Sequence, residues 1–376
     1  MRKTILTLTV IFLIGYSTSS FIARPETESA GDSLRTLYSR PISQWPKPQI
    51  DSGAKWEEFA VIPADTTFML PDKDPITHLG KILFFDPRLS GSNQISCSTC
   101  HDPDEAWQDG KVVALGNDHL QGSRNTQSLL NVYIYKNLFW DGRSVNFESQ
   151  MIEPLGAVHE MNMDVPSLPE KLGKIDGYKT LFKTAYGDTA IRFSQIATAL
   201  EAFQKTIKSR RTKFDEFIAG KAEKFTNDEI AGLDLFRNKA RCMNCHNGTF
   251  LTDNNFHNIG LTYYGRKYED LGRYKVTKLK EDVGRFRTPS LRELGNTSPW
   301  MHNGLFDNLS GVVNVYNSGM PQPAKTDAQK QDTLFPKTDR LIKPLNLTPT
   351  EKQQLVAFLG TLSGVPYRMR RPELPK

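Results

Sequence analysis

The four cysteines of the chain fall into two identical C-x-x-C-H frames, and this spacing has a specific chemical use. C-x-x-C-H is the attachment signature of c-type haem: each thiol bonds one haem vinyl group, and the following histidine is the proximal ligand of the iron. The two frames therefore predict two covalently attached haems. The predicted haem-binding residues are Cys97, Cys100, His101, Cys242, Cys245 and His246.

Three other interpretations of the same cysteines compete with haem attachment. A pair of C-x-x-C disulfides needs no following histidine, yet a histidine follows each frame. A single zinc site with four thiolates requires two frames that are distant in the sequence to converge in space. A thioredoxin-like redox motif belongs to a βαβ unit, and no such pattern surrounds either frame. The duplication and the two histidines favour haem.

The segments around these frames have mainly helical periodicity, and no run of alternating strands is present. Capping-box patterns at 226–229 and 348–351 predict the starts of two helices. Long irregular segments at 102–128 and 247–300 are of the kind that wrap a bound group or carry function. Another helix face is predicted for Ile196, Leu200, Phe203 and Ile207, with Phe214 and Phe217 expected to extend it.

The chain upstream of each frame carries the same Gly, Leu and Phe pattern, at 79–86 and at 232–236. We interpret this as an internal duplication of a haem-binding unit. The expected fold class is mainly α, with two cytochrome c-like haem domains and long loops.

Composition excludes several classes of protein. With 376 residues and 38% hydrophobic residues, the chain is expected to form about two domains with sizeable cores. It is not a disordered chain, a collagen-like chain or a polytopic membrane protein, and four cysteines are too few for a disulfide-stapled mini-domain. The net charge of +6 comes without a basic block, so nucleic-acid binding is not indicated.

The N-terminus has the layout of a secretory signal peptide. Arg2 and Lys3 precede an apolar run over 5–16, and small residues follow it. The run is too short for a comfortable transmembrane helix, and no cysteine follows it for a lipoprotein anchor. We expect membrane attachment only if this leader stays uncleaved. We therefore predict export to the periplasm. The expected segments are a signal peptide (1–20), an extended N-terminal arm (21–55), a first haem domain (56–205), a second haem domain (206–345) and a C-terminal helix and tail (346–376).

Several further motifs carry a resemblance to a known family. They lie at 79–90, 95–103, 124–125, 130–131, 139–143, 160–161, 286–292 and 299–304. In these motifs the chain resembles the bacterial di-haem cytochrome c peroxidase family, which includes the MauG-like di-haem enzymes. The resemblance implies that the N-terminal haem, on His101, is the peroxidatic one. It implies that the C-terminal haem, on His246, accepts electrons and passes them on.

The resemblance also implies roles for three further residues. Trp140 matches the tryptophan that relays electrons between the haems. Glu160 matches the distal glutamate, which acts as general acid and base on peroxide, and Gln150 matches the glutamine that positions peroxide or water. Judged by residue type alone, Trp140 is a buried aromatic and Glu160 a surface or helix-capping carboxylate.

The distal side of the N-terminal haem departs from the family pattern. Many members carry a histidine in the 102–128 loop that caps the iron, and its register here falls on Asn117. Asparagine is a poor iron ligand. Either the loop shifts to let His119 bind, or the iron is open from the start, as in the MauG-like branch; we favour the open iron.

The resemblance places the sixth ligand of the C-terminal haem at Tyr316. Peroxidases proper have methionine there, whereas MauG-like enzymes have tyrosine. Met320 follows one helical turn later and is expected to share a helix face with Tyr316, so either can be the ligand. Phenolate lowers the potential of the iron, and thioether raises it.

A calcium ion between the haems is also implied by the resemblance. Its ligands are an asparagine side chain, two backbone carbonyl oxygens and waters. The matching positions are Asn125, Thr297 and Pro299. Hard oxygen ligands of this kind suit Ca²⁺.

Together, the motifs and the resemblance predict an exported di-haem c-type peroxidase. It would reduce hydrogen peroxide to water with electrons from a small periplasmic donor, a c-type cytochrome or a cupredoxin, and a homodimer is one expected assembly. The first alternative is a MauG-like oxidase that uses peroxide to oxidise a partner protein, which Tyr316 and Asn117 favour. The second is a di-haem electron-transfer cytochrome without catalysis.

Overall fold

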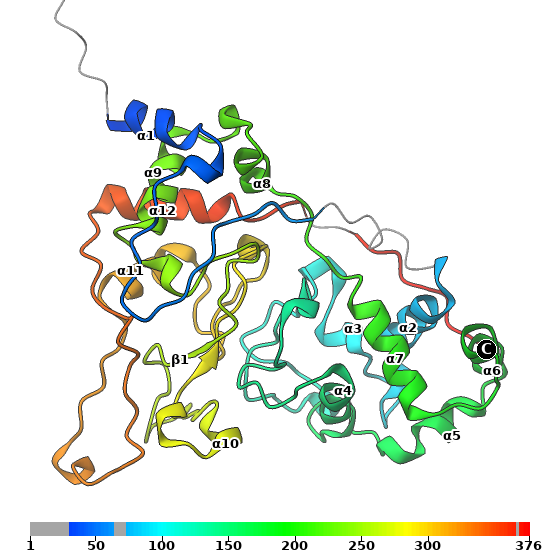
Figure 1. Cartoon of the computed structure of the whole chain (residues 1–376). Helices are drawn as coiled ribbons and strands as arrows, with labels where there is room; N and C mark the ends of the chain where they lie inside the picture. Colours follow the sequence, from blue (N-terminus) through cyan, green and yellow to red (C-terminus); the bar gives the residue numbers. More distant parts are fainter. Residues whose placement is uncertain (1–29, 64–72, 366–367) are drawn as a thin grey trace, which may run out of the picture.

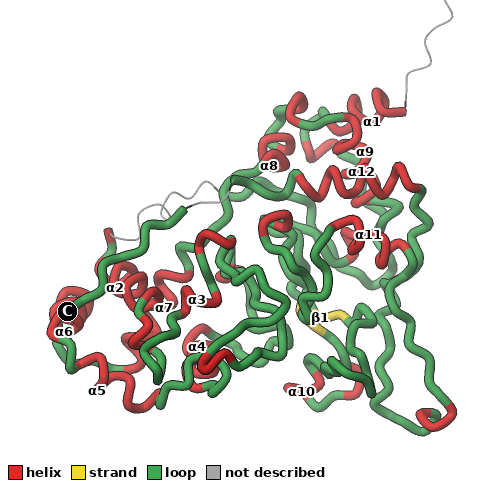
Figure 2. The backbone as a smooth tube through the Cα atoms, turned by 180° about the vertical axis from the view of Figure 1, so that it is seen from behind, coloured by secondary structure: helices red, strands yellow, loops and turns green. Residues whose placement is uncertain are grey.

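The computed structural model describes residues 30–63, 73–365 and 368–376, and the predicted signal peptide (1–20) lies outside these ranges. Within them the chain is mostly helical, with long loops and a small two-stranded antiparallel sheet (Figure 2). This confirms the mainly α fold. Among the described helices, none is long and apolar enough to cross a membrane.

The regular elements are two short strands and a series of α-helices. The strands β1 (Phe256–His257) and β2 (Phe286–Arg287) pair with each other. The α-helices are α1 (Ala30–Tyr38), α2 (Pro75–Phe85), α3 (Cys97–Cys100), α4 (Phe147–Gly156), α5 (Leu168–Gly173), α6 (Asp176–Tyr186), α7 (Phe193–Gln204), α8 (Lys213–Ile218), α9 (Asn227–Arg237), α10 (Tyr274–Thr277), α11 (Leu309–Asn317) and α12 (Pro349–Gly360).

The helices form two lobes, each with its own hydrophobic core (Figure 1). The N-terminal lobe contains α2 to α7, and Phe84 and Phe203 are among its fully buried residues. The C-terminal lobe contains α1, α8, α9, α11 and α12, with Phe236 and Phe358 at its centre. The boundaries predicted for the two haem domains stay a prediction.

The helix that precedes each cysteine frame packs closely against a helix from later in the chain: α2 packs against α7, and α9 packs against α12. Gly80 and Gly232 permit these contacts, because a Cβ atom would lie 1.8 Å from the Ala199 oxygen in one pair and 2.0 Å from the Gln354 oxygen in the other. In both pairs the next turn of the partner helix brings a phenylalanine against the glycine. The matching arrangement supports the duplication inferred from the sequence.

The N-terminal arm differs from the expectation of an extended segment. Residues 30–38 form α1, which packs against α9, and the Tyr38 hydroxyl donates to Asp234 at 2.7 Å. Further along the arm, Trp45 and Phe59 enter the core of the C-terminal lobe. The extended interpretation is wrong for residues 30–38 because nine residues are too few for a clear period, and the helix is held by the lobe it packs on.

The two predicted helix starts are confirmed, whereas the predicted helix face that begins at Ile196 is shorter than expected. The capping boxes at Thr226 and Thr348 begin α9 and α12. However, α7 ends at Gln204, and Phe214 and Phe217 belong to α8 in the other lobe. Extension of the first face is therefore wrong: Thr212 starts a new helix with its own capping box.

The C-terminal tail connects the lobes after α12. It leaves the C-terminal lobe and runs along the N-terminal lobe, where the chain ends near α6 (Figure 1). Met369 packs into the core of the N-terminal lobe, and the Lys376 carbonyl oxygen accepts from the Gly177 amide at 2.9 Å. The tail therefore ties the two lobes together.

Candidate functional site

The two cysteine frames adopt the same local turn. In the first frame, α3, the His101 amide donates to the Cys97 carbonyl oxygen at 2.9 Å. In the second, a 3-10 turn, the His246 amide donates to the Cys242 carbonyl oxygen at 2.8 Å. One helical turn brings residues three apart onto one side, so each frame presents both thiols and the histidine together.

Both frame histidines are oriented in the same way. Nδ1 of His101 lies 3.1 Å from the Trp107 carbonyl oxygen, and Nδ1 of His246 lies 3.1 Å from the Leu251 carbonyl oxygen. An N–H donated from Nδ1 leaves the Nε2 lone pair available for a metal. Burial lowers the pKa of both imidazoles, which favours the neutral form that binds iron.

The alternative uses of the cysteines find no support in these positions. None of the four is part of a disulfide. Cys97 packs against the core of the N-terminal lobe, and Cys242 against that of the C-terminal lobe. The frames therefore do not converge on one four-thiolate zinc site.

A cavity of about 250 Å³ lies at the second frame and extends towards the N-terminal lobe. One wall contains Cys242, Cys245 and His246, and apolar side chains such as Phe236 and Leu355 line the interior. Its walls also hold four buried nitrogen atoms that have no hydrogen-bond partner among the described residues: Nε of Arg241, Nδ2 of Asn244, Nη1 of Arg287 and Nε2 of His302.

This combination fits a haem. The macrocycle is a flat apolar body, and its two propionates are carboxylates that accept hydrogen bonds from N–H donors. An apolar cavity with unpartnered donors on its walls, beside two thiols and an oriented histidine, has the matching chemistry. The residues that would hold the group there are Cys242, Cys245 and His246.

Trp140 reaches this cavity from the N-terminal half of the chain. Its Nε1 donates to the Asn125 carbonyl oxygen at 2.9 Å, and its own carbonyl oxygen accepts from the Arg287 amide at 2.8 Å. The indole therefore stands in the wall of the second frame's cavity while the segment that carries it belongs to the first half. The predicted relay residue has contacts on both sides of the interface.

Glu160 lies near the first frame. Burial, followed by the charges of Asp109 and Glu160, raises the pKa of the Cys100 thiol to about 12, so Glu160 is within electrostatic reach of that cysteine. Burial also raises the pKa of Glu160 above its ordinary value, which brings the carboxyl closer to the range of a proton shuttle. The second predicted residue, Gln150, is half-buried on α4, the helix that leads towards Glu160.

The two distal-loop residues occupy different environments. Asn117 is buried, and its amide donates to the Glu160 carbonyl oxygen at 2.8 Å. His119 has a left-handed backbone with φ +58° and an exposed side chain. The residue next to the proposed distal glutamate is thus Asn117.

The two sixth-ligand candidates differ in whether they line the cavity. Tyr316 on α11 is a wall residue of the cavity, and burial raises the pKa of its phenol. The chain turns after α11 ends at Asn317, and the Met320 amide donates to the Val315 carbonyl oxygen at 2.9 Å with φ +56° at Met320. The expectation of a shared helix face is therefore wrong. Met320 is buried but does not line the cavity.

The three predicted calcium positions come together at this cavity. All three line it: Asn125 comes from the N-terminal half of the chain, and Thr297 and Pro299 come from the C-terminal half. The Asn125 Nδ2 donates to the Lys111 carbonyl oxygen at 2.8 Å, so its Oδ1 points the other way. An amide oxygen and nearby carbonyls are the donor set that Ca²⁺ takes.

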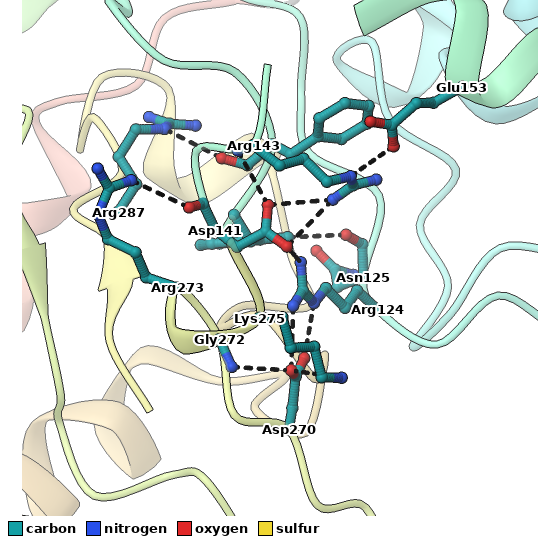
Figure 3. Close-up of polar contacts among 12 residues, drawn as sticks. Arg124, Asn125, Asp141, Arg143, Glu153, Asp270, Gly272, Arg273, Lys275 and Arg287 are labelled. Carbon is teal, nitrogen blue, oxygen red and sulfur yellow. Dashed lines mark hydrogen bonds and ion pairs between the residues drawn. The ribbon is translucent and has the colours of Figure 1, made fainter. Parts of the chain in front are cut away.

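A charged network beside Trp140 joins the two halves (Figure 3). Arg124 makes two contacts with Asp270, at 2.6 and 3.0 Å, and one with Asp141 at 2.7 Å. Arg143 links Asp141 to Glu153 on α4. Burial raises the pKa of Asp270, but the Arg124 guanidinium outweighs this effect and brings that pKa far below its ordinary value. Sequence reasoning missed this network, since no local pattern predicts a pair 146 residues apart.

A second polar cluster lies beside the second frame. The His257 ring binds Asp339 through Nδ1 at 2.7 Å and Asp253 through Nε2 at 2.9 Å. Cys245, Asp253 and His257 bring their ligand atoms within 4.8 Å of one another. Because Cys245 belongs to the frame, we interpret His257 as a brace for that wall. The strand β1 has only two residues, which is too short for a hydrophobic alternation that would have predicted this role of His257 from the sequence.

Comparisons with known proteins agree with the geometry. A family model described as di-haem cytochrome c peroxidase matches residues 75–223. The chain is 34% identical over 331 residues to the methylamine utilization protein MauG of Methylophilus methylotrophus, covering 84% of this chain and 94% of that protein. It is 32% identical over 328 residues to the cytochrome-c peroxidase IdrP2 of Denitromonas iodatirespirans, covering 80% and 84%. A solved structure of a MauG-like protein associated with microbial copper homeostasis matches with a TM-score of 0.69 and 30% identity, covering 83% and 94%.

Proposed function

Since this chain belongs to the di-haem cytochrome c peroxidase family, we propose that it reduces hydrogen peroxide to water with electrons from a small donor protein. The family implies two c-type haems. The observation that carries the proposal is the pair of matching frames, of which the first has a carboxyl group, Glu160, within electrostatic reach. A pure electron-transfer cytochrome has no need of such a group.

Residues of each lobe would hold one haem. Cys97, Cys100 and His101 would bind the first, in a proposed domain over 56–205, and Cys242, Cys245 and His246 would bind the second, in a proposed domain over 206–345. When bound, the haems supply redox-active iron that exchanges electrons with peroxide and donor. The predicted export signal at 1–20 and the relatives named as cytochrome-c peroxidases support a periplasmic donor such as a c-type cytochrome or a cupredoxin.

Trp140 would carry electrons across the interface between the lobes. Its hydrogen bond to the Asn125 carbonyl oxygen fixes the plane of the indole, and the Arg124 network holds the neighbouring Asp141. The hydrogen bond limits rotation of the ring, and the ion pair fixes the residue that follows it. The calcium ion proposed at Asn125, Thr297 and Pro299 would stiffen the same place, because Asn125 is both the indole's acceptor and the proposed metal ligand.

Glu160 would move the protons that the reaction requires. Reduction of one peroxide to two waters consumes two electrons and two protons. A carboxylate beside the first frame can take the first proton from peroxide and return it to the oxygen that leaves as water. The raised pKa of Glu160 suits this task, since the carboxyl must be both acid and base within one turnover. Gln150 would position peroxide by hydrogen bonds.

A second function, peroxide-dependent oxidation of a partner protein, is favoured by two observations. Tyr316 lines the cavity at the second frame and Met320 does not, so we propose Tyr316 as the sixth ligand, the residue type found in MauG-like enzymes. Asn117, buried against Glu160, takes the place of a capping histidine, while the His119 side chain is exposed. Both features support an iron that is open in the resting enzyme.

The test of the peroxidase function is the Glu160→Gln variant. We expect it to fold, to carry two haems by intact mass, and to lose about 10²–10⁴-fold in peroxide turnover with reduced cytochrome c as donor. Glutamine keeps the size of the side chain but does not shuttle a proton.

Glu148→Gln is the matched control, because Glu148 lies exposed on α4. It should keep the turnover of the unmodified enzyme. Near-normal turnover of Glu160→Gln would show that this carboxylate is structural. A mass with fewer than two haems would refute the site assignment itself.

A further inference from the structure

Arg287 on β2 is a buried cation in an unusual setting. Arg287 is only 3% exposed. Nε lies 3.4 Å from the Phe139 carbonyl oxygen, a long contact, and the guanidinium carbon lies 3.4 Å from the centre of the Tyr135 ring. Nη1 is buried and has no hydrogen-bond partner among the described residues. The chain itself therefore leaves part of this guanidinium unsatisfied.

The other two arginines that are buried to this degree, Arg237 and Arg292, each have a carboxylate partner. Arg237 pairs with Glu58 at 2.5 Å, and Arg292 pairs with Asp215 at 2.8 Å. Within the described ranges, Arg287 has no carboxylate within ion-pair distance. A guanidinium keeps its charge in proteins, and a buried charge without a counter-charge is costly. An anion from outside the chain is the natural partner.

The position of Arg287 identifies the kind of anion. Its side chain lines the cavity that contains Cys242, Cys245 and His246. The Tyr135 ring covers one face of the guanidinium, so the in-plane N–H groups are what remains for a ligand. A planar fork of N–H donors matches a carboxylate, which it binds with two hydrogen bonds. Among the groups expected in this cavity, the haem propionates are carboxylates.

We propose that Arg287 binds a propionate of the C-terminal haem and acts as the counter-cation of that haem. The proposal rests on the proposed function only in taking a haem to be attached at the second frame. A fixed positive charge stabilises the reduced iron relative to the oxidised iron, because the reduced state carries one positive charge fewer. Arg287 would therefore raise the midpoint potential of this haem and set how readily it accepts electrons.

The experiment is a redox titration of the holoenzyme and of Arg287→Gln, followed by absorption and electron paramagnetic resonance so that each haem is observed. Arg287→Gln should carry two haems and show a lower midpoint potential for the C-terminal haem. Arg287→Lys should show a smaller decrease, since it keeps the charge but loses the planar fork.

Arg285→Gln is the matched control. Arg285 lies two residues away, its side chain is 37% exposed, and it pairs weakly with Asp282 at 3.5 Å. Removal of this solvent-screened charge should leave both potentials unchanged.

Two results would overturn the proposal: an unchanged potential of the C-terminal haem in Arg287→Gln, or a shift confined to the N-terminal haem. If Arg287→Gln does not fold, the propionate bending band in the resonance Raman spectrum of Arg287→Lys decides. A shifted band of the C-terminal haem supports the proposal, and an unshifted band refutes it. The potential is an equilibrium quantity, so it tests Arg287 whether or not the enzyme turns over peroxide.

Discussion

Removal of Arg124 should weaken the association of the two lobes. Arg124 comes from the N-terminal half and binds Asp270 of the C-terminal half through two N–H groups, at 2.6 and 3.0 Å (Figure 3). It also binds Asp141, which follows Trp140, the proposed relay residue. The side chains of Arg124, Asp141 and Asp270 are 13%, 5% and 10% exposed. The variant Arg124→Met keeps much of the apolar stem and removes all three contacts.

The expected loss follows from this burial. Breaking a buried pair by removing one partner costs about 3–5 kcal/mol, because a buried charge is left uncompensated. Here Asp270 keeps Lys275 at 3.2 Å, and Asp141 keeps Arg143 at 3.1 Å. These remaining cations place the expected loss at the lower end, about 3 kcal/mol of unfolding free energy.

The assay is urea unfolding, with haem absorption and far-ultraviolet circular dichroism as probes. A double-mutant cycle with Asp270→Asn should give a coupling energy of about 1–3 kcal/mol between the two residues. Arg124→Met should also separate the unfolding of the two lobes into distinct transitions. Arg88→Met is the matched control, since Arg88 binds buried Asp86 within the N-terminal lobe; it should destabilise without separating them. A coupling energy below about 0.5 kcal/mol would refute the reasoning and show a solvent-screened pair.

Three further predictions concern the metal sites and one titrating side chain. Exhaustive chelation of Ca²⁺ should slow electron transfer between the haems and change the spin state of at least one; unchanged spectra and activity would show that Asn125, Thr297 and Pro299 hold no functional ion. Tyr316→Met should raise the midpoint potential of the C-terminal haem, whereas an unchanged electron paramagnetic resonance spectrum would exclude Tyr316 as its ligand. Burial lowers the pKa of His257, but the hydrogen bonds that its ring donates to the Asp253 and Asp339 carboxylates raise this pKa above its ordinary value. The stabilisation that the charged His257 ring gives to the fold is complete below about pH 6.5 and is lost as the pH rises towards the folded-state pKa. His257→Asn should therefore cost more unfolding free energy at about pH 6 than at about pH 9 in urea titrations. Equal costs at both pH values would contradict a charged His257 held between the two carboxylates.

The positions of the interface side chains required the tertiary structure. Asn125, Thr297 and Pro299 were predicted as calcium ligands only through the family resemblance, and the fold then brought them to one cavity. Met320 illustrates the limit of helical spacing. The step from Tyr316 to Met320 predicts a shared face only if the helix continues, and α11 ends at Asn317.

The unpaired state of Arg287 was likewise beyond sequence reasoning. The Phe-Arg-Thr-Pro motif contains it, but a motif does not say whether a carboxylate lies nearby. That depends on every segment packed around β2, including Tyr135 and Phe139 from the other half of the chain. The same holds for α1, whose residues pack against α9 from far away in the sequence.

By itself, the sequence determined the features that depend on neighbouring residues. The two C-x-x-C-H frames predict covalent haem attachment and a proximal ligand within five residues, and the capping boxes at Thr226 and Thr348 specify helix starts within one turn. Only the tertiary structure decided which charges meet, which buried donors stay unpartnered and which of Tyr316 and Met320 lines the cavity. The physical reason is range: backbone turns and caps are set by contacts a few residues apart, whereas burial and ion pairing are set by segments that meet only after the chain has folded.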